Sequence, residues 1–328
     1  MQKILIAGGA GFVGYHLAKR LAAQGNRITL ADNFFRGKRD ADLLRLLELS
    51  NVRLIEGDLS QSGAWERLGG GYDQVYHLVS VNGTKLFYDM PHEVLRIGVA
   101  STMHALDWFR NMNGVPGAKI LYTSSNEAYA SALDAYGTLP FPTPEEVPLV
   151  IADPYNARWS YGAQKLIGEM FFIHYAKAYD LRMVIVRPHN FYGPRAGYGH
   201  VIPGTIAKIR EKMDPFPLPG ADETRSFCYI DDAVEAMDLL MCASETDGQT
   251  YHIGNPEEVR IDALIEKIFE AAQWRPAKIE KTESPAGSVK RRIPHVGKIK
   301  KDIGWEPRTP LDEGLRKTVA WYSEQSSV

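Results

Sequence analysis

Cysteine is scarce in this 328-residue chain, and charge of either sign is not in excess. The two cysteines, Cys228 and Cys242, are too few for a disulfide framework and suit a reducing compartment; each is expected to be a small buried side chain. Lys and Arg number 38 against 40 Asp and Glu, so no overall field attracts nucleic acid or an anionic membrane. No metal-ligand cluster is visible, no run of about 18 apolar residues occurs, and the apolar N-terminal run is too short for a signal peptide. These absences predict a cytoplasmic protein with no metal, nucleic-acid or membrane partner.

What the sequence does contain is a regular alternation of short apolar runs with amphipathic segments. This βαβ rhythm predicts an α/β fold, a doubly wound parallel sheet of the Rossmann type with helices on both faces. Functional side chains are then expected at the carboxyl ends of the strands. The expected strands are residues 3–7, 27–31, 52–55, 74–79, 119–123 and 183–186, and the clearest expected helices are 13–23, 92–110 and 159–179.

A glycine triplet, Gly8, Gly11 and Gly14, follows the first expected strand and opens a helix. Each glycine has a mechanical reason: a tight turn, close approach of backbone to a pyrophosphate, and close packing of helix on strand. A triplet alone is weak evidence, but here the required strand precedes it and the required helix follows it. We therefore predict a dinucleotide-binding loop.

Two acidic residues at later strand ends extend this prediction. Asp32 closes the second expected strand, where a carboxylate accepts hydrogen bonds from an adenosine ribose and repels a 2′-phosphate, so NAD is favoured over NADP. Arg36 and Lys38 lie close enough in sequence to weaken that preference. Asp58 follows the third strand and is expected either to accept from the adenine amino group or to serve as a turn residue.

The chain is expected to divide into a nucleotide-binding Rossmann domain, residues 1–188, and a smaller C-terminal α/β lobe for the substrate, residues 189–328. A strand at 249–253 is a candidate to rejoin the first sheet. The helix at 159–179 is apolar nearly all round, so one face needs a cover other than the sheet. Either a second copy of the chain or the second lobe could supply it, and a homodimer is the favoured expectation.

Two Tyr–Lys pairs have the four-residue spacing that puts both side chains on one helical face. A phenol is a poor base at neutral pH unless nearby positive charge lowers its pKa. Tyr15 and Lys19 lie behind the glycine loop and are expected to be structural. Tyr161 and Lys165 lie in the helix after the strand that ends near Ser125, whose hydroxyl can bind the same substrate oxygen, so this trio is the predicted catalytic group.

Motifs along nearly the whole chain resemble those of the extended short-chain dehydrogenase/reductases, and within them the NAD-dependent nucleotide-sugar epimerases and dehydratases. The motifs are Gly8-Gly-Ala-Gly-Phe-Val-Gly, Asp32-Asn, Gly57-Asp-Leu, Val75-Tyr-His-Leu, Ser124-Ser-Asn-Glu-Ala-Tyr, Tyr161-Gly-Ala-Gln-Lys, Arg187-Pro-His-Asn-Phe-Tyr-Gly-Pro and Arg225-Ser-Phe-Cys-Tyr-Ile-Asp-Asp.

The resemblance implies a tightly held NAD and a transient 4-keto sugar formed when Tyr161 takes the proton of the 4-hydroxyl group. The implied cofactor contacts are Gly8, Gly11, Phe12, Val13, Gly14, Asp32, Asn33, Asp58, Leu59, Leu78, Tyr161 and Lys165. The implied substrate contacts are Asn126, Asn190, Val201, Arg225 and Arg292.

Glu127 is the residue on which the reaction type depends. The resemblance places it where dehydratases and decarboxylases of this group carry a glutamate, although a turn carboxylate is also an interpretation. A 4-epimerase needs no further acid or base and is the first expectation; a 4,6-dehydratase or a uronate decarboxylase using Glu127 is the alternative. Asn126 counts against a dehydratase, because an amide cannot protonate a leaving hydroxyl. A non-catalytic NAD-binding regulator is a remote alternative, and the sequence does not name the nucleoside or the sugar.

Overall fold

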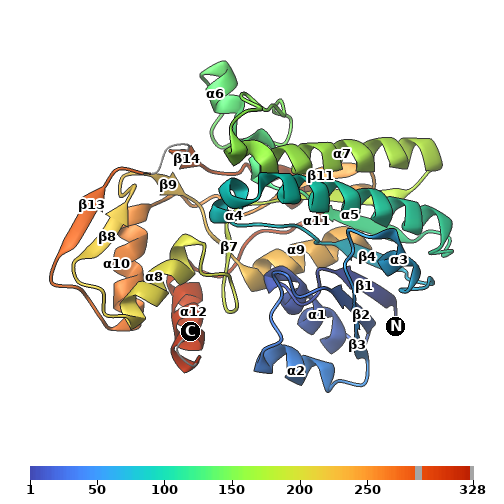
Figure 1. Ribbon diagram of the computed structural model, residues 1–328, viewed down its shortest axis with the longest axis horizontal. Helices are drawn as coiled ribbons and strands as arrows, with labels where there is room; N and C mark the ends of the chain where they lie inside the picture. Colours follow the sequence, from blue (N-terminus) through green and yellow to red (C-terminus); the bar gives the residue numbers. More distant parts are fainter. Residues whose placement is uncertain (285–289, 326–328) are drawn as a thin grey trace.

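The centre of the molecule is a seven-stranded parallel sheet (Figure 1). The computed structural model describes residues 1–284 and 290–325. All six strands expected from the alternating pattern are present, so the predicted fold class is confirmed. The strand order reverses between β1 and β4, the switch point where doubly wound sheets bind ligands. In spatial order the strands are β11 (Gln249–Ile253), β6 (Arg182–Pro188), β5 (Lys119–Thr123), β4 (Gln74–His77), β1 (Lys3–Ala7), β2 (Arg27–Asp32) and β3 (Val52–Glu56).

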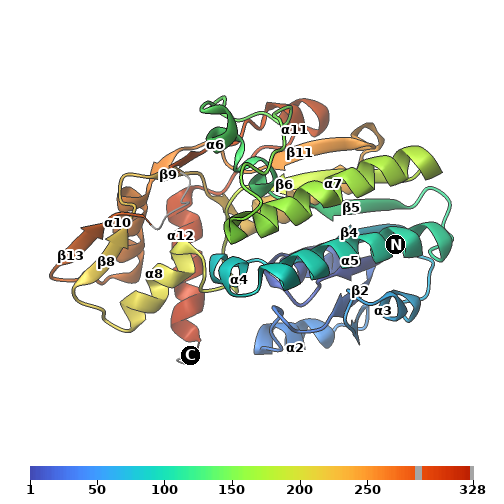
Figure 2. The same ribbon diagram turned by 45° about the horizontal axis from the view of Figure 1, so that its top comes forward.

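Helices cover both faces of the sheet (Figure 2) because successive strand residues point to opposite sides. Ile4 and Ile6 of β1 pack in one core cluster, whereas Leu5 and Ala7 pack in another. The first cluster lies under α1 (Phe12–Ala23), α2 (Ala41–Leu47) and α9 (Ile230–Cys242), and the second under α3 (Ser62–Glu66), α5 (Pro91–Asn111) and α7 (Ser160–Tyr179). Among the described residues, no helix is both long and apolar enough to cross a membrane.

A smaller lobe lies beyond the carboxyl ends of the strands. The first core cluster continues into it through Leu264 and Leu315, so the two lobes share packed side chains. Its helices are α8 (Val201–Arg210), α10 (Ile261–Ala272) and α12 (Leu311–Glu324). Its strands pair as β8 (Phe216–Pro219) with β13 (Ile279–Thr282), and as β12 (Val259–Arg260), β9 (Thr224–Arg225) and β14 (Arg291–Arg292) side by side.

Short elements connect the two lobes and the strand ends. β7 (Phe191–Tyr192) pairs with β10 (Cys228–Tyr229), and α11 (Gly297–Ile303) packs against β11. The remaining elements are α4 (Thr84–Asp89), α6 (Ala132–Tyr136) and the 3₁₀ turns η1 (Asn126–Tyr129), η2 (Ala157–Trp159) and η3 (Ser244–Thr246).

Two expectations differ from the structure. The strand at 249–253 rejoins the first sheet as β11, as expected, but α9 and α11, which also follow residue 188, pack in the sheet domain as well. Cys242 is exposed rather than buried, whereas Cys228 is buried. Cys242 lies in the last turn of α9, where its Sγ atom is 3.8 Å from Oδ1 of Asp238.

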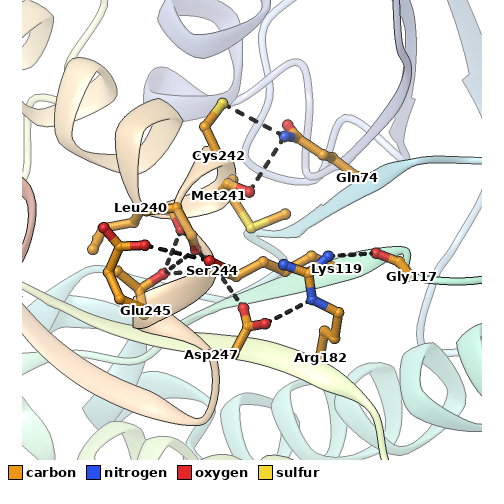
Figure 3. Close-up of polar contacts among 12 residues, drawn as sticks. Gln74, Gly117, Lys119, Arg182, Leu240, Met241, Cys242, Ser244, Glu245 and Asp247 are labelled. Carbon is orange, nitrogen blue, oxygen red and sulfur yellow. Dashed lines mark hydrogen bonds and ion pairs between the residues drawn. The ribbon is translucent and has the colours of Figure 1, made fainter.

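A buried lysine joins α9 to the sheet (Figure 3). Lys119 of β5 is 2% exposed, and its Nζ atom donates to the carbonyl oxygens of Leu240 and Ala243 at 2.8 and 2.7 Å. These carbonyls lie where α9 ends and also accept from Oγ1 of Thr246 at 2.7 and 2.9 Å, so the ammonium group and the hydroxyl cap the helix together. Asp247 forms ion pairs with Lys119 at 2.7 Å and with Arg182 at 2.6 Å. Burial lowers the pKa of Lys119 below its ordinary value.

Replacing Lys119 with methionine should destabilise the fold by about 2 kcal/mol, because the buried carbonyls lose a charged donor and Asp247 loses one of its two cations. Chemical denaturation of the purified proteins measures this free energy of unfolding. Lys177→Met, at an exposed position of α7, is the matched control and should change it by less than about 0.5 kcal/mol. Equal stabilities of the two variants would contradict a structural role for the Lys119 contacts.

Candidate active site

A cavity of about 560 Å³ lies at the carboxyl ends of β1, β4, β5 and β6 and extends to the second lobe. Residues far apart in the sequence meet there, from Gly8 in the first loop to Arg292 in β14. Within residues 1–284 and 290–325, no three His, Cys, Asp or Glu side chains are grouped so that they could hold a metal ion. The polar side chains that line the cavity include those of tyrosine, lysine, serine, glutamate and arginine.

The glycine loop forms one end of the cavity. Gly8 has φ +83°, a conformation that favours glycine. A Cβ atom at position 14 would lie 2.4 Å from the carbonyl oxygen of Gly8, so only glycine fits there. Gly11 precedes α1, and no side chain caps the first turn, which leaves its N–H groups to meet an anion. This cradle fits the pyrophosphate of a dinucleotide.

Other predicted cofactor residues are divided between the cavity and its surroundings. Phe12, Val13 and Leu78 line the cavity, as do Arg36 and Lys38. The residues that lie outside its lining are Asp32, Asn33, Asp58 and Leu59.

Asp32 is buried, and its carboxylate accepts from the backbone N–H groups of Ala10 at 2.9 Å and Phe34 at 2.8 Å. Burial raises its pKa. The carboxylate thus ties the glycine loop to the end of β2. Asp58 accepts from the N–H of Ser60, as a turn residue does, and Leu59 packs in the second core cluster.

The predicted catalytic trio comes together in the middle of the cavity. Tyr161 is 6% exposed and stacks on Phe87 of α4, with ring centroids 4.9 Å apart. Lys165 lies one helical turn later, and its Nζ atom donates to the carbonyl oxygen of Thr123 at 2.6 Å. Ser125 lines the same cavity at the end of β5. The three side chains therefore face one space from α7 and β5.

Burial sets the protonation of this trio in the protein without cofactor. It raises the pKa of Tyr161 to about 12, although hydrogen bonds with Ser80 and Ser125 lower it. It lowers the pKa of Lys165 to about 7, although the charge of Glu169 raises it. The phenol is thus not ionised at neutral pH, and additional positive charge near the tyrosine is required before it can act as a base.

A buried ion pair fixes the trio in place. Ser124 donates to Oε1 of Glu169 on α7 at 2.5 Å, and Arg187 of β6 donates to both carboxylate oxygens at 2.8 Å. All three side chains are buried. Because α7 also carries Tyr161 and Ser124 adjoins Ser125, this contact sets the distance between the catalytic side chains.

Glu127 lies between two arginines. Its Oε1 atom is 2.7 Å from Nη1 of Arg292, and its Oε2 atom is 2.8 Å from Nη2 of Arg158. Burial alone would raise the pKa of Glu127, but the charges and hydrogen bonds of Arg292 and Arg158 together outweigh it and lower the pKa. We call Glu127, Arg158 and Arg292 the clamp. Its carboxylate is ionised at neutral pH, so it carries no proton to donate.

Donors without partners surround the clamp. Within the described part of the chain, Nη1 of Arg158, Nη2 of Arg292 and Nδ2 of Asn126 are buried and have no hydrogen-bond partner. Buried donors of this kind are costly unless a ligand satisfies them. Two arginines and one glutamate leave a formal charge of +1 in the clamp. The arrangement fits an anionic group of the substrate.

Arg225 and Arg292 are paired residues of the neighbouring parallel strands β9 and β14, so their side chains leave the same face. Burial lowers the pKa of Arg225 to about 10, with the charge of Arg292 adding to the effect. Arg225 also forms an ion pair with Glu223 at 2.7 Å. Because Arg292 is held by Glu127, Arg225 is the guanidinium group at this wall that suits the oxygens of a diphosphate, the role expected for both arginines.

A second cavity of about 490 Å³ continues from the first into the smaller lobe. Asn190 and Arg225 line both cavities, and Val201 lines only the second. Asn190 has φ +43°, and its amide donates to the carbonyl oxygen of Ser226 at 2.9 Å. The structure therefore brings Asn126, Asn190, Arg225 and Arg292 to the active-site cavity and places Val201 beyond it.

Sequence reasoning missed Arg158, Phe87 and Ser80. Arg158 had a local signal, since it lies three residues before Tyr161 in a turn that Asn156 caps by accepting from its N–H at 3.0 Å. Phe87 and Ser80 lie in the segment after β4 and reach Tyr161 only through the fold. Nothing in their spacing indicates that contact.

The chain is similar in sequence and fold to known proteins. A profile of the NAD dependent epimerase/dehydratase family matches residues 4–254. The chain is 31% identical to UDP-glucuronic acid decarboxylase 5 of Arabidopsis thaliana over 96% of this chain and 87% of the relative. It is 30% identical to a UDP-N-acetyl-alpha-D-glucosaminuronate decarboxylase of Bacillus cytotoxicus over 98% of each. The crystal structure of a UDP-glucose 4-epimerase from Thermotoga maritima superposes with a TM-score of 0.85 at 26% identity, over 98% of this chain and 99% of the other.

Gly14→Ala should weaken NAD binding at least about tenfold, because the new methyl group forces the loop apart where the pyrophosphate is expected. Isothermal titration of NAD into the purified variants measures the affinity. Gly63→Ala is the matched control, since a Cβ atom there meets nothing within 4 Å. An unchanged affinity in Gly14→Ala, with the fold intact by circular dichroism, would refute the role assigned to this loop.

Proposed function

Because the chain belongs to the NAD dependent epimerase/dehydratase family, with NAD as its cofactor, we propose that it decarboxylates a uronic acid linked to a nucleoside diphosphate. The observation that carries the proposal is the clamp, an ionised glutamate between two arginines whose remaining donors are unsatisfied. A neutral hexose has no group that calls for this charge. The two decarboxylases at 31% and 30% identity support the same reading.

The side chains suit the steps of this reaction. Tyr161 accepts the proton of the sugar 4-hydroxyl group, with Ser125 holding the same oxygen, while C4 is oxidised. NAD, when bound, takes up the hydride and later returns it, and its oxidised ring supplies positive charge beside the tyrosine. Arg158 and Arg292 hold the carboxylate on C5 through planar, fixed forks.

Carbon dioxide leaves when the bond between C5 and its carboxylate breaks. The electron pair passes into the C4 ketone as an enolate, so the departure needs no added acid. A proton from water then bonds to C5 in place of the lost carboxylate, hydride returns to C4, and Tyr161 returns its proton to the 4-oxygen. Because nothing has to protonate a leaving hydroxyl, a permanently ionised Glu127 does not hinder the sequence.

The other reactions fit the site less well. A 4,6-dehydratase needs a proton donor at the 6-hydroxyl group, and neither the Asn126 amide nor the ionised Glu127 provides one. The 4-epimerase, which the sequence analysis placed first, needs no charged clamp, although the similarity to a UDP-glucose 4-epimerase structure keeps it as the second candidate. The intact Tyr161, Lys165 and Ser125 argue against a non-catalytic regulator.

The test is to incubate the NAD-loaded protein with a panel of nucleoside diphosphate sugars and the corresponding uronic acids, and to analyse the products by chromatography and mass spectrometry. A uronic acid substrate that loses one carbon dioxide is the expected result.

Tyr161→Phe should lower turnover at least about 100-fold with NAD still bound. Arg158→Gln should raise KM for the uronic acid at least about tenfold and leave binding of the matched neutral sugar nearly unchanged, because only the carboxylate loses a charged partner.

Two other products would each reject decarboxylation. A product of unchanged mass that elutes as a new isomer indicates epimerisation, and loss of water indicates dehydration. Equal effects of Arg158→Gln on the acid and the neutral sugar would mean that Arg158 does not bind the carboxylate. Arg158→Lys separates charge from the planar fork, and only partial recovery of KM is expected from it.

We also infer that two copies of the chain pair through α5 and α7. These helices lie side by side on the outside of the sheet in both views (Figures 1 and 2). Ile167 and Met170 of α7 are 36% and 51% exposed, so its apolar face is not covered by the second lobe. Packing against the same face of a second copy would remove this surface from water.

Light scattering at micromolar concentration should give the mass of a dimer, and Met170→Glu should give that of a monomer, because the interface would bury a charge. Leu44→Glu on α2, where the side chain is 50% exposed, is the matched control and should remain dimeric. If the unmodified protein is a monomer at this concentration, the inferred pairing is wrong.

A further inference from the structure

The second cavity is where the nucleoside of the substrate is expected to bind. This inference rests on the proposed function, which supplies a nucleoside diphosphate sugar as the ligand. It shares Asn190, Phe191, His200 and Arg225 with the active-site cavity. A ligand that holds its sugar at Tyr161 and its diphosphate at Arg225 therefore continues into this space. Its apolar lining, which includes Leu218, Phe227, Ile261 and Ile265, suits the flat faces of a nucleobase.

Strand β8 forms one wall of this cavity and has one open edge. β8 and β13 make a two-stranded parallel sheet, with β13 on the outside of the lobe (Figure 1). Phe216 donates from its N–H to the carbonyl oxygen of Lys278 at 2.8 Å, and Gly220 donates to that of Thr282 at 3.0 Å. The backbone N–H and C=O groups of successive residues point to opposite sides of a strand. Pro217 and Pro219 therefore point their backbone groups away from β13.

The outward-facing residues of β8 are Pro217 and Pro219, and proline has no N–H group. The open edge of β8 therefore offers carbonyl oxygens and no donor. Among the described residues, no third strand pairs with it, and neither of these two carbonyl oxygens accepts a hydrogen bond from the backbone or a side chain elsewhere in the chain. Both prolines line the cavity.

We propose that this edge selects a nucleobase with an exocyclic amino group and disfavours uracil and thymine. The amino groups of cytosine, adenine and guanine can donate to the carbonyl oxygens of Pro217 or Pro219. Uracil and thymine have one donor there, N3–H, flanked by carbonyl oxygens at C2 and C4. When N3–H donates to one proline carbonyl, the C4 oxygen, which replaces the cytosine amine, still faces an edge without a donor. An acceptor brought against acceptors loses its bond to water without replacement, which costs affinity.

A charged donor in the cavity can bind an oxygen that both pyrimidines share. Lys208 of α8 also lines it, with Nζ 5.5 Å from the ring centroid of Phe216. An ammonium group there can bind the C2 carbonyl oxygen, which cytosine and uracil share. It therefore strengthens binding of both pyrimidines, and the distinction between them stays with the edge of β8.

The experiment is to titrate the NAD-loaded protein with CDP, ADP, GDP, UDP and dTDP by calorimetry. The tightest ligand should be one with an amino-bearing base, and CDP should bind at least about tenfold more tightly than UDP. The titration also identifies which of the three amino-bearing bases fits best. UDP or dTDP binding as tightly as the best of the other three would overturn the proposal; the two decarboxylases at 31% and 30% identity carry UDP in their names.

Variants of the two prolines test whether the edge of β8 causes the preference for an amino-bearing base. Pro219→Ala and Pro217→Ala each add one N–H to the open edge, so each should raise the affinity for UDP relative to CDP by several fold. Pro256→Ala, at an exposed position outside both cavities, should leave that ratio unchanged. A ratio unmoved in both edge variants would show that the edge of β8 does not read the base. Because the titration contains no sugar, its result is independent of whether the protein decarboxylates a uronic acid.

Discussion

The ion pairs of Glu127 with Arg158 and Arg292 are the interaction on which the site depends. The three residues come from η1, η2 and β14, so one carboxylate holds together the end of the sheet, the start of the catalytic helix and the second lobe. Buried charges are stable only when they are paired. The pairing fixes the protonation of Glu127 and the direction of both arginines. A group that looks like an acid or base in the sequence therefore acts as an ionised anchor for two cations.

Burial acts in the opposite way on Tyr161, the predicted catalytic base, because its side chain has no buried ion pair of its own. Tyr161 and Lys165 lie in an interior that opposes the charged form of each: one pKa is raised to about 12 and the other is lowered to about 7. Without additional charge, neither residue is prepared for chemistry at neutral pH. The positive charge of an oxidised nicotinamide ring would favour the phenolate. Proton transfer by Tyr161 would then be coupled to the presence of the oxidised cofactor.

Local sequence patterns were enough to predict the fold and the parts of the site that a single element specifies. Neighbours within one turn or one strand are enough to specify β1, the glycine loop, and the four-residue spacing of Tyr161 and Lys165. Arg158 and Phe87 could not be assigned in this way, because their contacts with Glu127 and Tyr161 cross between elements. The same holds for Asp32, a strand-end carboxylate whose contacts with Ala10 and Phe34 appear only when the loops are in place.

The prolines of β8 extend this argument to the substrate. In the sequence they belong to a proline-rich stretch that reads as a connection, and only the register with β13 shows that both face the same open edge. Their effect arises from a missing donor, which no side-chain motif records. If both proposals hold, the two lobes divide recognition: charged side chains at the sheet end select the sugar, and a strand edge without N–H groups selects the base. Because these determinants lie on different elements, the sugar and the base can change separately while the fold and its NAD chemistry stay the same.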